Sequence, residues 1–405
     1  MEILMGFLII CAGILGGTFT GLLPGIHVNL IAGVILYNIV FLNQIFSNQM
    51  LVIFILVMSL THTFISFIPS LIFGVPSADT VLSILPGHQM ILEGEGFLAL
   101  FLSTAGSFAG LIFTLIITPI CFFLLEKFYE IYKNIVIFFL IVSIILLLLT
   151  DKNPNKIFWS IIIILFSSGT GLLVLNSKSI EYPLLVLFTG LFGVATILYS
   201  LMQSCAKLPK QNFKVDYKKN LNKEFIKSVL FGGIASVFCS ITPGIGNAQA
   251  GILSTMFFKN ITSKLFIVVL GAINTINFSL SIITFYLISR TRNGSIHAIS
   301  QFYYDFTLDM LLLYLVILLF AGIICFFVTL ILGKVIIQIV EKFNVKIINI
   351  IILVSIFIIV CFLSNWVGML VLLMSTCLGI TCLLLEVKRV HLMSVLIFPV
   401  IINLI

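Results

Sequence analysis

Two Pro-Gly motifs, Pro24-Gly25 and Pro243-Gly244, interrupt apolar segments that are otherwise continuous. Proline breaks the helix that precedes it, and glycine permits backbone conformations that other residues avoid. The helix that restarts after each motif presents unpaired N–H groups and the positive end of its dipole, which together attract an anion. A proline kink used only for packing is the alternative for one motif alone, whereas a matched pair favours an anion site.

Polar residues follow both motifs and could orient a bound anion. The amides of Asn29, Asn247 and Gln249 could donate hydrogen bonds to it. His27 could bind a carboxylate or titrate near neutral pH, although a histidine satisfied by packing is the alternative. Since no Lys or Arg is expected at mid-membrane, helix termini and polar side chains would hold the anion. The predicted substrate-binding residues are Pro24, Gly25, His27, Asn29, Pro243, Gly244, Gly246, Asn247 and Gln249.

A second set of polar residues lies downstream of each Pro-Gly motif, within long apolar segments. Hydroxyl and amide groups inside a membrane span either bond neighbouring helices together or surround an ion. Ionisable groups there are functional candidates, so Asp79 could couple transport to a proton or cation, with a solvated loop as the alternative. We predict sodium or proton coupling without any cofactor or bound metal centre. The predicted coupling residues are Thr61, Thr63, Asp79, Asn274, Thr275 and Asn277.

The composition assigns the chain to the lipid bilayer. Of 405 residues, 61% are hydrophobic and 9% are charged, and the mean hydropathy is +1.30, whereas soluble proteins carry about 25% charged residues. The short alternating segments of a membrane β-barrel are absent from the sequence. Seven lysines between positions 207 and 227 account for the net charge of +7, which fits a cytoplasmic loop better than a nucleic-acid surface. No hydrolytic, phosphate-loop or zinc motif occurs, so we do not expect an enzyme.

These features predict an all-α polytopic membrane protein with about 10–12 transmembrane helices. If the 205–226 loop is cytoplasmic, most other Lys and Arg clusters fall on the same side, provided that segments 3–41 and 227–258 are helical hairpins. The first hairpin then begins outside and the second begins inside. The chain therefore divides into a first repeat, 1–204, and a second repeat of inverted topology, 227–405, both with broken or re-entrant helices.

Several stretches resemble one known family, the TctA permeases of tripartite tricarboxylate transporters, and in particular its short archaeal members. The paired motifs Leu23-Pro24-Gly25-Ile26 and Thr242-Pro243-Gly244-Ile245-Gly246 are similar to the paired signatures of that family. Further similarity lies in the Pro-Gly-rich stretch 68–96 and in the ending 387–393. The second half departs from the pattern, because it reads Leu-Ser-Ile-Ile-Thr at 280–284 where a Gly-Pro-rich loop is expected.

The resemblance implies an inverted-repeat permease of the cytoplasmic membrane that is driven by an ion gradient. It also implies a carboxylate solute, an extracytoplasmic solute-binding protein and a small membrane subunit as partners. The leading hypothesis is therefore a secondary transporter whose anionic solute sits between the two breaks. A flippase for a polyprenyl-phosphate lipid carrier is an alternative, and a lateral opening toward lipid would distinguish it. A membrane scaffold is another, favoured if the breaks lie far apart or face lipid.

Overall fold

The computed structural model describes most of the chain. It covers residues 2–23, 28–73, 79–132, 138, 141–142, 145, 148, 153–177, 179–180, 183–202, 209–241, 246–255, 257–258, 261–303, 305–342 and 345–404. Every regular element in these residues is helical, which confirms the predicted all-α class.

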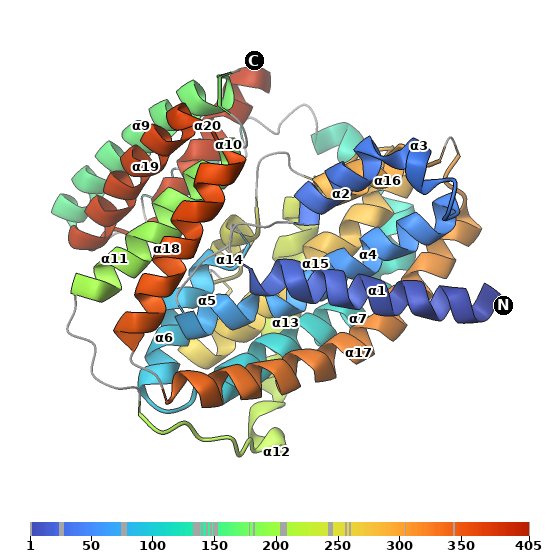
Figure 1. The fold of residues 1–405 in the computed structure, drawn as a ribbon, viewed down its shortest axis with the longest axis horizontal. Helices are drawn as coiled ribbons and strands as arrows, with labels where there is room; N and C mark the ends of the chain where they lie inside the picture. Colours follow the sequence, from blue (N-terminus) through green and yellow to red (C-terminus); the bar gives the residue numbers. More distant parts are fainter. Residues whose placement is uncertain are drawn as a thin grey trace.

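The helices pack around two hydrophobic cores, which form two groups of helices in Figure 1. The larger core is built mainly by α1 (Glu2–Leu22), α2 (Val28–Tyr37), α4 (Asn48–Ile65), α5 (Phe67–Phe73), α6 (Ile84–Leu92), α7 (Gly96–Tyr132), α13 (Lys223–Ile241), α14 (Asn247–Thr255), α15 (Ser263–Ile288), α16 (Gly294–Ser300) and α17 (Leu308–Val340). The smaller core is built by α9 (Pro154–Leu175), α10 (Pro183–Phe188), the π-helical turn η2 (Thr189–Val194), α11 (Ala195–Met202), α18 (Val345–Leu363), α19 (Trp366–Leu384) and the 3-10 turn η3 (Arg389–Met393). The remaining elements are α3 (Ile39–Leu42), η1 (Val81–Ser83), α12 (Tyr217–Asn220) and α20 (Ser394–Leu404).

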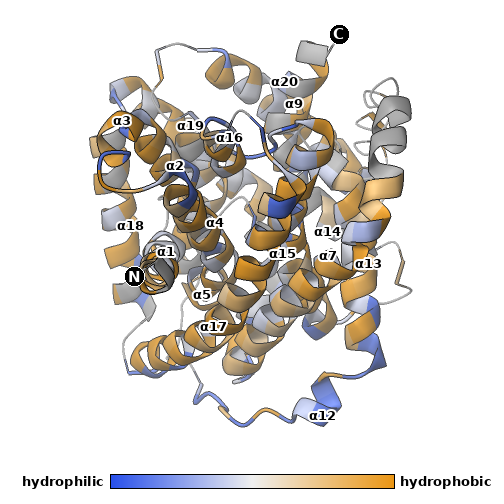
Figure 2. Cartoon of the chain, turned by 90° about the vertical axis from the view of Figure 1, so that its right-hand side faces the viewer, coloured by the Kyte–Doolittle hydropathy of each residue, from blue (hydrophilic) through white to orange (hydrophobic). Residues whose placement is uncertain are grey.

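Within the described residues, seven helices are long and apolar enough to cross a membrane, and three shorter apolar helices accompany them. Most residues of the long helices are hydrophobic, whereas α12 and much of the loop next to it are hydrophilic (Figure 2). The multi-pass membrane architecture is therefore confirmed. The long helices begin at capping hydroxyls, because the side chains of Ser47, Thr262 and Thr307 accept hydrogen bonds from the first turns of α4, α15 and α17.

Helices α1 and α4 run side by side in the same direction. Gly13 of α1 faces Val57 of α4, and eight residues later Gly21 faces Ile65. A Cβ atom on either glycine would lie 2.8 or 2.7 Å from its partner side chain, so glycine lets the two helices approach closely.

Helices α13 and α15 form the matching pair in the second half. Gly232 of α13 faces Val269 of α15, and further along α13 the carbonyl of Cys239 accepts a hydrogen bond from Arg292, just past the end of α15. Both helices of this pair therefore also run in one direction.

The two pairs are inverted relative to each other. Ser59 of α4 donates a hydrogen bond to Ser295, beyond the end of α15, at 3.0 Å. One turn later on α4, the Thr63 hydroxyl lies 3.1 Å from that of Thr275, in the middle of α15. Residue numbers thus rise along α4 as they fall along α15, so these central helices are antiparallel. An inverted repeat would place its central helices antiparallel in this way, and the repeat itself stays a prediction.

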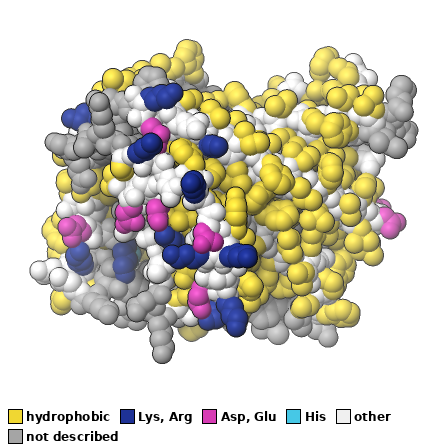
Figure 3. All heavy atoms as spheres, turned by 90° about the horizontal axis from the view of Figure 1, so that it is seen from below, with side chains coloured by type: hydrophobic (Ala, Val, Ile, Leu, Met, Phe, Trp, Pro, Cys, Tyr) yellow, Lys and Arg dark blue, Asp and Glu magenta, His cyan; other side chains and the backbone are white. Residues whose placement is uncertain are grey.

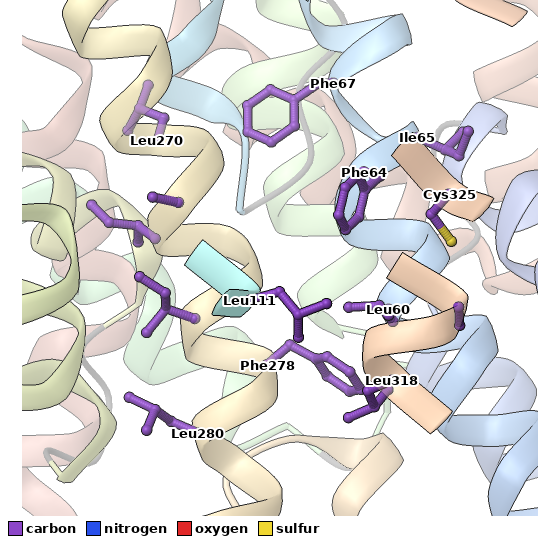
Figure 4. Close-up of a cluster of buried hydrophobic side chains, with 14 of the residues drawn as sticks. Leu60, Phe64, Ile65, Phe67, Leu111, Leu270, Phe278, Leu280, Leu318 and Cys325 are labelled. Carbon is purple, nitrogen blue, oxygen red and sulfur yellow. The ribbon is translucent and has the colours of Figure 1, made fainter. Parts of the chain in front are cut away.

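The central helices are almost entirely buried and carry the larger core. Leu60 and Phe64 of α4, Leu111 of α7, Phe278 of α15 and Leu318 of α17 point toward one another (Figure 4). The two cores each combine elements from residues 1–204 and from residues 227–405, so neither core belongs to one predicted half alone.

Helices α7 and α15 make the closest backbone approach of this core. Gly106 and Gly110 on α7 form a small-xxx-small pair facing Val268 and Ala272, and Gly271 on α15 faces the Ser103 carbonyl. A Cβ atom on Gly271 would lie 2.2 Å from that carbonyl oxygen, too close for any side chain without a backbone shift.

We expect Gly271→Ala to lower the free energy of unfolding by about 1–3 kcal/mol, the usual cost of overpacking a core. Gly169→Ala is the matched control, because Gly169 also lies inside a helix but its Cβ would meet no atom within 4 Å. There the helix preference of alanine should give a stabilisation of about 0.5–1 kcal/mol. Denaturation of the purified protein in detergent measures both, and equal effects of the two substitutions would contradict the α7–α15 contact.

Charged side chains gather at one end of the molecule, while the rest of the same face is mainly hydrophobic (Figure 3). There Lys264 forms an ion pair with Glu95 at 2.6 Å, and Gln211 of the lysine-rich loop donates its backbone N–H to Glu341. The lysine-rich loop therefore lies beside Glu341 and its neighbour Lys342, a segment that the positive-inside rule assigned to the same side.

Candidate functional site

Four polar side chains meet where the central helices α4 and α15 cross. Thr63 on α4 and Asn274, Thr275 and Asn277 on α15 are each at most 6% exposed. The Thr63 and Thr275 hydroxyls lie 3.1 Å apart, and the Asn274 amide donates a hydrogen bond to the Thr63 carbonyl at 3.0 Å. Four of the six predicted coupling residues therefore form one buried cluster.

Asn247 is the hub of this cluster and comes from the helix that restarts after the second break. It is 7% exposed, and its amide nitrogen donates to Asp79 Oδ1 at 3.0 Å and to Asn274 Oδ1 at 2.9 Å. Its oxygen accepts a hydrogen bond from the Asn277 amide. All the strong hydrogen-bonding groups of this side chain are thus engaged, which fixes the start of α14 against α15.

Asp79 reaches the cluster from the segment that precedes η1 and α6. It is half-buried and its carboxylate faces Asn247. In the described part of the chain, Asn277 Oδ1 is buried and makes no hydrogen bond. One chain of hydrogen bonds therefore runs from Asp79 through Asn247 and Asn274 to Thr63 and Thr275.

Three consecutive residues on α4 face three different helices. Thr61 lies 3.1 Å from Cys325 of α17, and His62 Nδ1 lies 3.2 Å from the Thr20 hydroxyl of α1, while Thr63 faces α15. Thr61 is therefore separate from the cluster to which the sequence assigned it. The cause is geometric, because residues two apart on a helix do not share a face.

Asn29 lies on α2, which restarts after the first break. Its side-chain oxygen accepts hydrogen bonds from the backbone N–H and the hydroxyl of Ser295, at 3.1 and 3.3 Å. The Ser295 hydroxyl also pairs with that of Ser59 on α4. The two restarted helices are thus anchored alike, since Asn247 contacts a segment of the first repeat and Asn29 contacts a segment of the second.

Only some of the other predicted binding residues lie in the described part of the structure. Gly246 directly precedes α14, and its carbonyl accepts the first hydrogen bond of that helix, from Ala250 at 3.2 Å. Gln249 lies on α14, but its side chain is outside the described part of the structure. The residues of the breaks themselves are outside the described residues: Pro24, Gly25, His27, Pro243 and Gly244.

A cationic residue that the sequence did not indicate contacts the last turn of α13. The guanidinium of Arg292 donates to the carbonyl of Cys239, in the last turn of α13. Arg292 follows a long apolar segment, so by sequence it resembles an ordinary loop residue. The chain instead folds back inward after α15, and α16 then packs against α2 and α4.

This inward segment contacts residues on the flanks of both Pro-Gly motifs. Arg292 contacts α13 three residues before break 242–245, and Ser295 contacts Asn29, two residues after break 24–27. Cys239 and Asn29, which lie on the flanks of the two Pro-Gly motifs, therefore both contact the single segment 292–295.

Comparison with known proteins agrees with this geometry. The model of the tripartite tricarboxylate transporter TctA family matches residues 7–394. The chain belongs to this family. An uncharacterized protein of Methanocaldococcus jannaschii is 29% identical, with 98% of each chain covered. No solved structure matches the chain.

The TctA family resemblance expected from the paired motifs is thereby confirmed. The structure also accounts for the departure from the TctA pattern at 280–284. Helix α15 continues unbroken through these residues to Ile288, and the chain turns inward only afterwards, at 289–293. The segment after this turn contains Arg292 and α16.

Proposed function

We propose that this TctA-family chain is the permease of a secondary transporter that moves an anionic, carboxylate-bearing solute across the cytoplasmic membrane. The solute would bind between the two helix breaks. Two hydrogen bonds carry this proposal. Asn247 at the start of α14 donates to Asp79 from the first half of the chain, and Asn29 on α2 accepts from Ser295 in the second half. Such pairing across an inverted repeat supports a site that opens alternately to the two sides.

The oxygen-rich cluster supports coupling to a cation. Sodium sites in transporters use carbonyl, hydroxyl and amide oxygens beside broken helices. Thr63, Thr275 and Asn277 offer such oxygens, and the Asp79 carboxylate could balance the charge of the ion or accept a proton. The anion and the cation would then occupy neighbouring places around Asn247, which would make the binding of each depend on the other.

Two alternative functions receive less support. A flippase for a polyprenyl-phosphate carrier needs access for the lipid from the bilayer, whereas the α4 and α15 helices that hold the cluster are almost entirely buried. A scaffold function would be favoured by breaks that lie apart, but one short segment contacts the flanks of both. The name of the family describes a tripartite transporter, so an extracytoplasmic solute-binding protein and a small membrane subunit are the partners that we propose.

Ligand-dependent stabilisation of the purified protein in detergent tests this function. We expect a di- or tricarboxylate to raise the melting temperature, with the stability gain reaching about 2.7 kcal/mol at 100 times its Kd. The panel should include undecaprenyl phosphate and should be measured in sodium and in potassium salts. Stabilisation by the lipid phosphate alone would support the flippase, and no response to any anion would refute an anion site.

A further inference from the structure

We propose that the guanidinium of Arg292 binds a carboxylate group of the transported solute, an inference that rests on the function proposed for this chain. The segment 289–293, which carries Arg292, is absent from the residues predicted by sequence. It places a positive charge at the flank of the second break, where the other predicted binding groups are amides and helix termini.

The position of Arg292 is determined by ordered elements on either side. Ser289 ends α15 in the left-handed backbone conformation, with φ at 51°, which turns the chain back toward the core. Asn293 then caps α16 by accepting a hydrogen bond from the Ile296 N–H at 2.8 Å. The arginine between these two turns is therefore held beside α13.

Arg292 is half-buried, and the segment that carries it reaches deep into the molecule. Ser295, three residues later, contacts Ser59, which is eleven residues into α4 from Asn48. At a rise of 1.5 Å per residue, Ser59 is about 16 Å from the start of that helix. The hydrocarbon core of a bilayer is about 30 Å thick, so this segment reaches its middle, where an ionisable side chain is costly and is usually functional.

The chemistry of arginine suits a carboxylate at this point. Its planar guanidinium has five N–H donors and binds carboxylates through two parallel hydrogen bonds. One hydrogen bond of the guanidinium, to the Cys239 carbonyl, orients the group. A cation at the end of α13 also offsets the negative end of that helix dipole, so a purely structural role for Arg292 is the alternative to be tested.

Two substitutions separate these roles. Both Arg292→Gln and Arg292→Lys can still donate a hydrogen bond to the Cys239 carbonyl, but only the lysine keeps the charge. We expect Arg292→Gln to weaken citrate binding by about 10- to 100-fold, as for the loss of a hydrogen bond between charged groups. Arg292→Lys should retain most of the affinity, and the melting temperatures without ligand should be alike.

Isothermal titration of the full-length protein in detergent with citrate gives the affinities, and Arg290→Gln is the control for a change of charge in the same segment. Equal citrate affinity in wild type and Arg292→Gln would refute this role and leave the proposed function intact. An equal loss of citrate affinity in Arg290→Gln would also refute it, because a general electrostatic attraction by positive charge in this segment would then explain both losses. If the wild type binds no carboxylate of the panel, the proposed function fails and this inference fails with it.

Discussion

Asn247→Ala should abolish stabilisation by carboxylates and also lower the stability of the protein without ligand. The substitution removes the partner of the buried Asn274 oxygen and of the Asn277 amide. Each buried polar group left without a partner costs about 1–3 kcal/mol, so we expect the free energy of unfolding to fall by about 2–6 kcal/mol. The start of α14 would no longer be fixed against α15, which removes the proposed anion site.

The melting temperature with and without citrate measures both effects. Asn38→Ala is the matched control, because Asn38 is an exposed asparagine just after α2 whose amide donates a local hydrogen bond to the carbonyl of Val34 in that helix. It should behave like the wild type. If Asn247→Ala kept the full response to citrate, Asn247 would have no part in citrate binding.

Asp79→Asn should remove the dependence on a coupling ion without unfolding the protein. Asparagine has the same shape as aspartate, and its side-chain oxygen could still accept the hydrogen bond from the Asn247 amide. The change removes only the negative charge, which in our proposal attracts a cation or carries a proton. We therefore expect a melting temperature close to that of the wild type in potassium salts.

The comparison of sodium with potassium salts, repeated across a range of pH, measures this effect. The wild type should gain stability from sodium or show a pH-dependent response to citrate, because a ligand that binds only the folded state stabilises it. Asp79→Asn should show neither. The same ion response in both proteins would exclude Asp79 from coupling.

Much of this architecture was predictable from the sequence. The Pro-Gly pairs predicted both helical breaks, and the polar residues inside apolar segments predicted the cluster of Thr63, Asn274 and Asn277. Both signals are local, because proline alters its own helix and a polar group in a membrane needs a nearby partner. The lysine-rich loop likewise predicted that it shares one side with the segment of Lys342.

Features that depend on tertiary contacts were not predictable. The different surroundings of Thr61 and Thr63 follow from the positions of α15 and α17 around α4, which the sequence of α4 does not contain. Arg292 was missed because a charge after an apolar segment usually marks the exit from the membrane. Only the inward turn after α15 brings it to α13.

Counterflow in proteoliposomes tests the central claim most directly. Vesicles that contain the purified protein are loaded with unlabelled citrate or another stabilising carboxylate and diluted into the labelled solute. Exchange needs only an alternately accessible site, so no solute-binding protein should be required. We predict accumulation of label above that in protein-free vesicles and its loss in Asn247→Ala vesicles. Equal label in wild-type and protein-free vesicles, for every carboxylate that stabilises the protein, would contradict the transporter assignment.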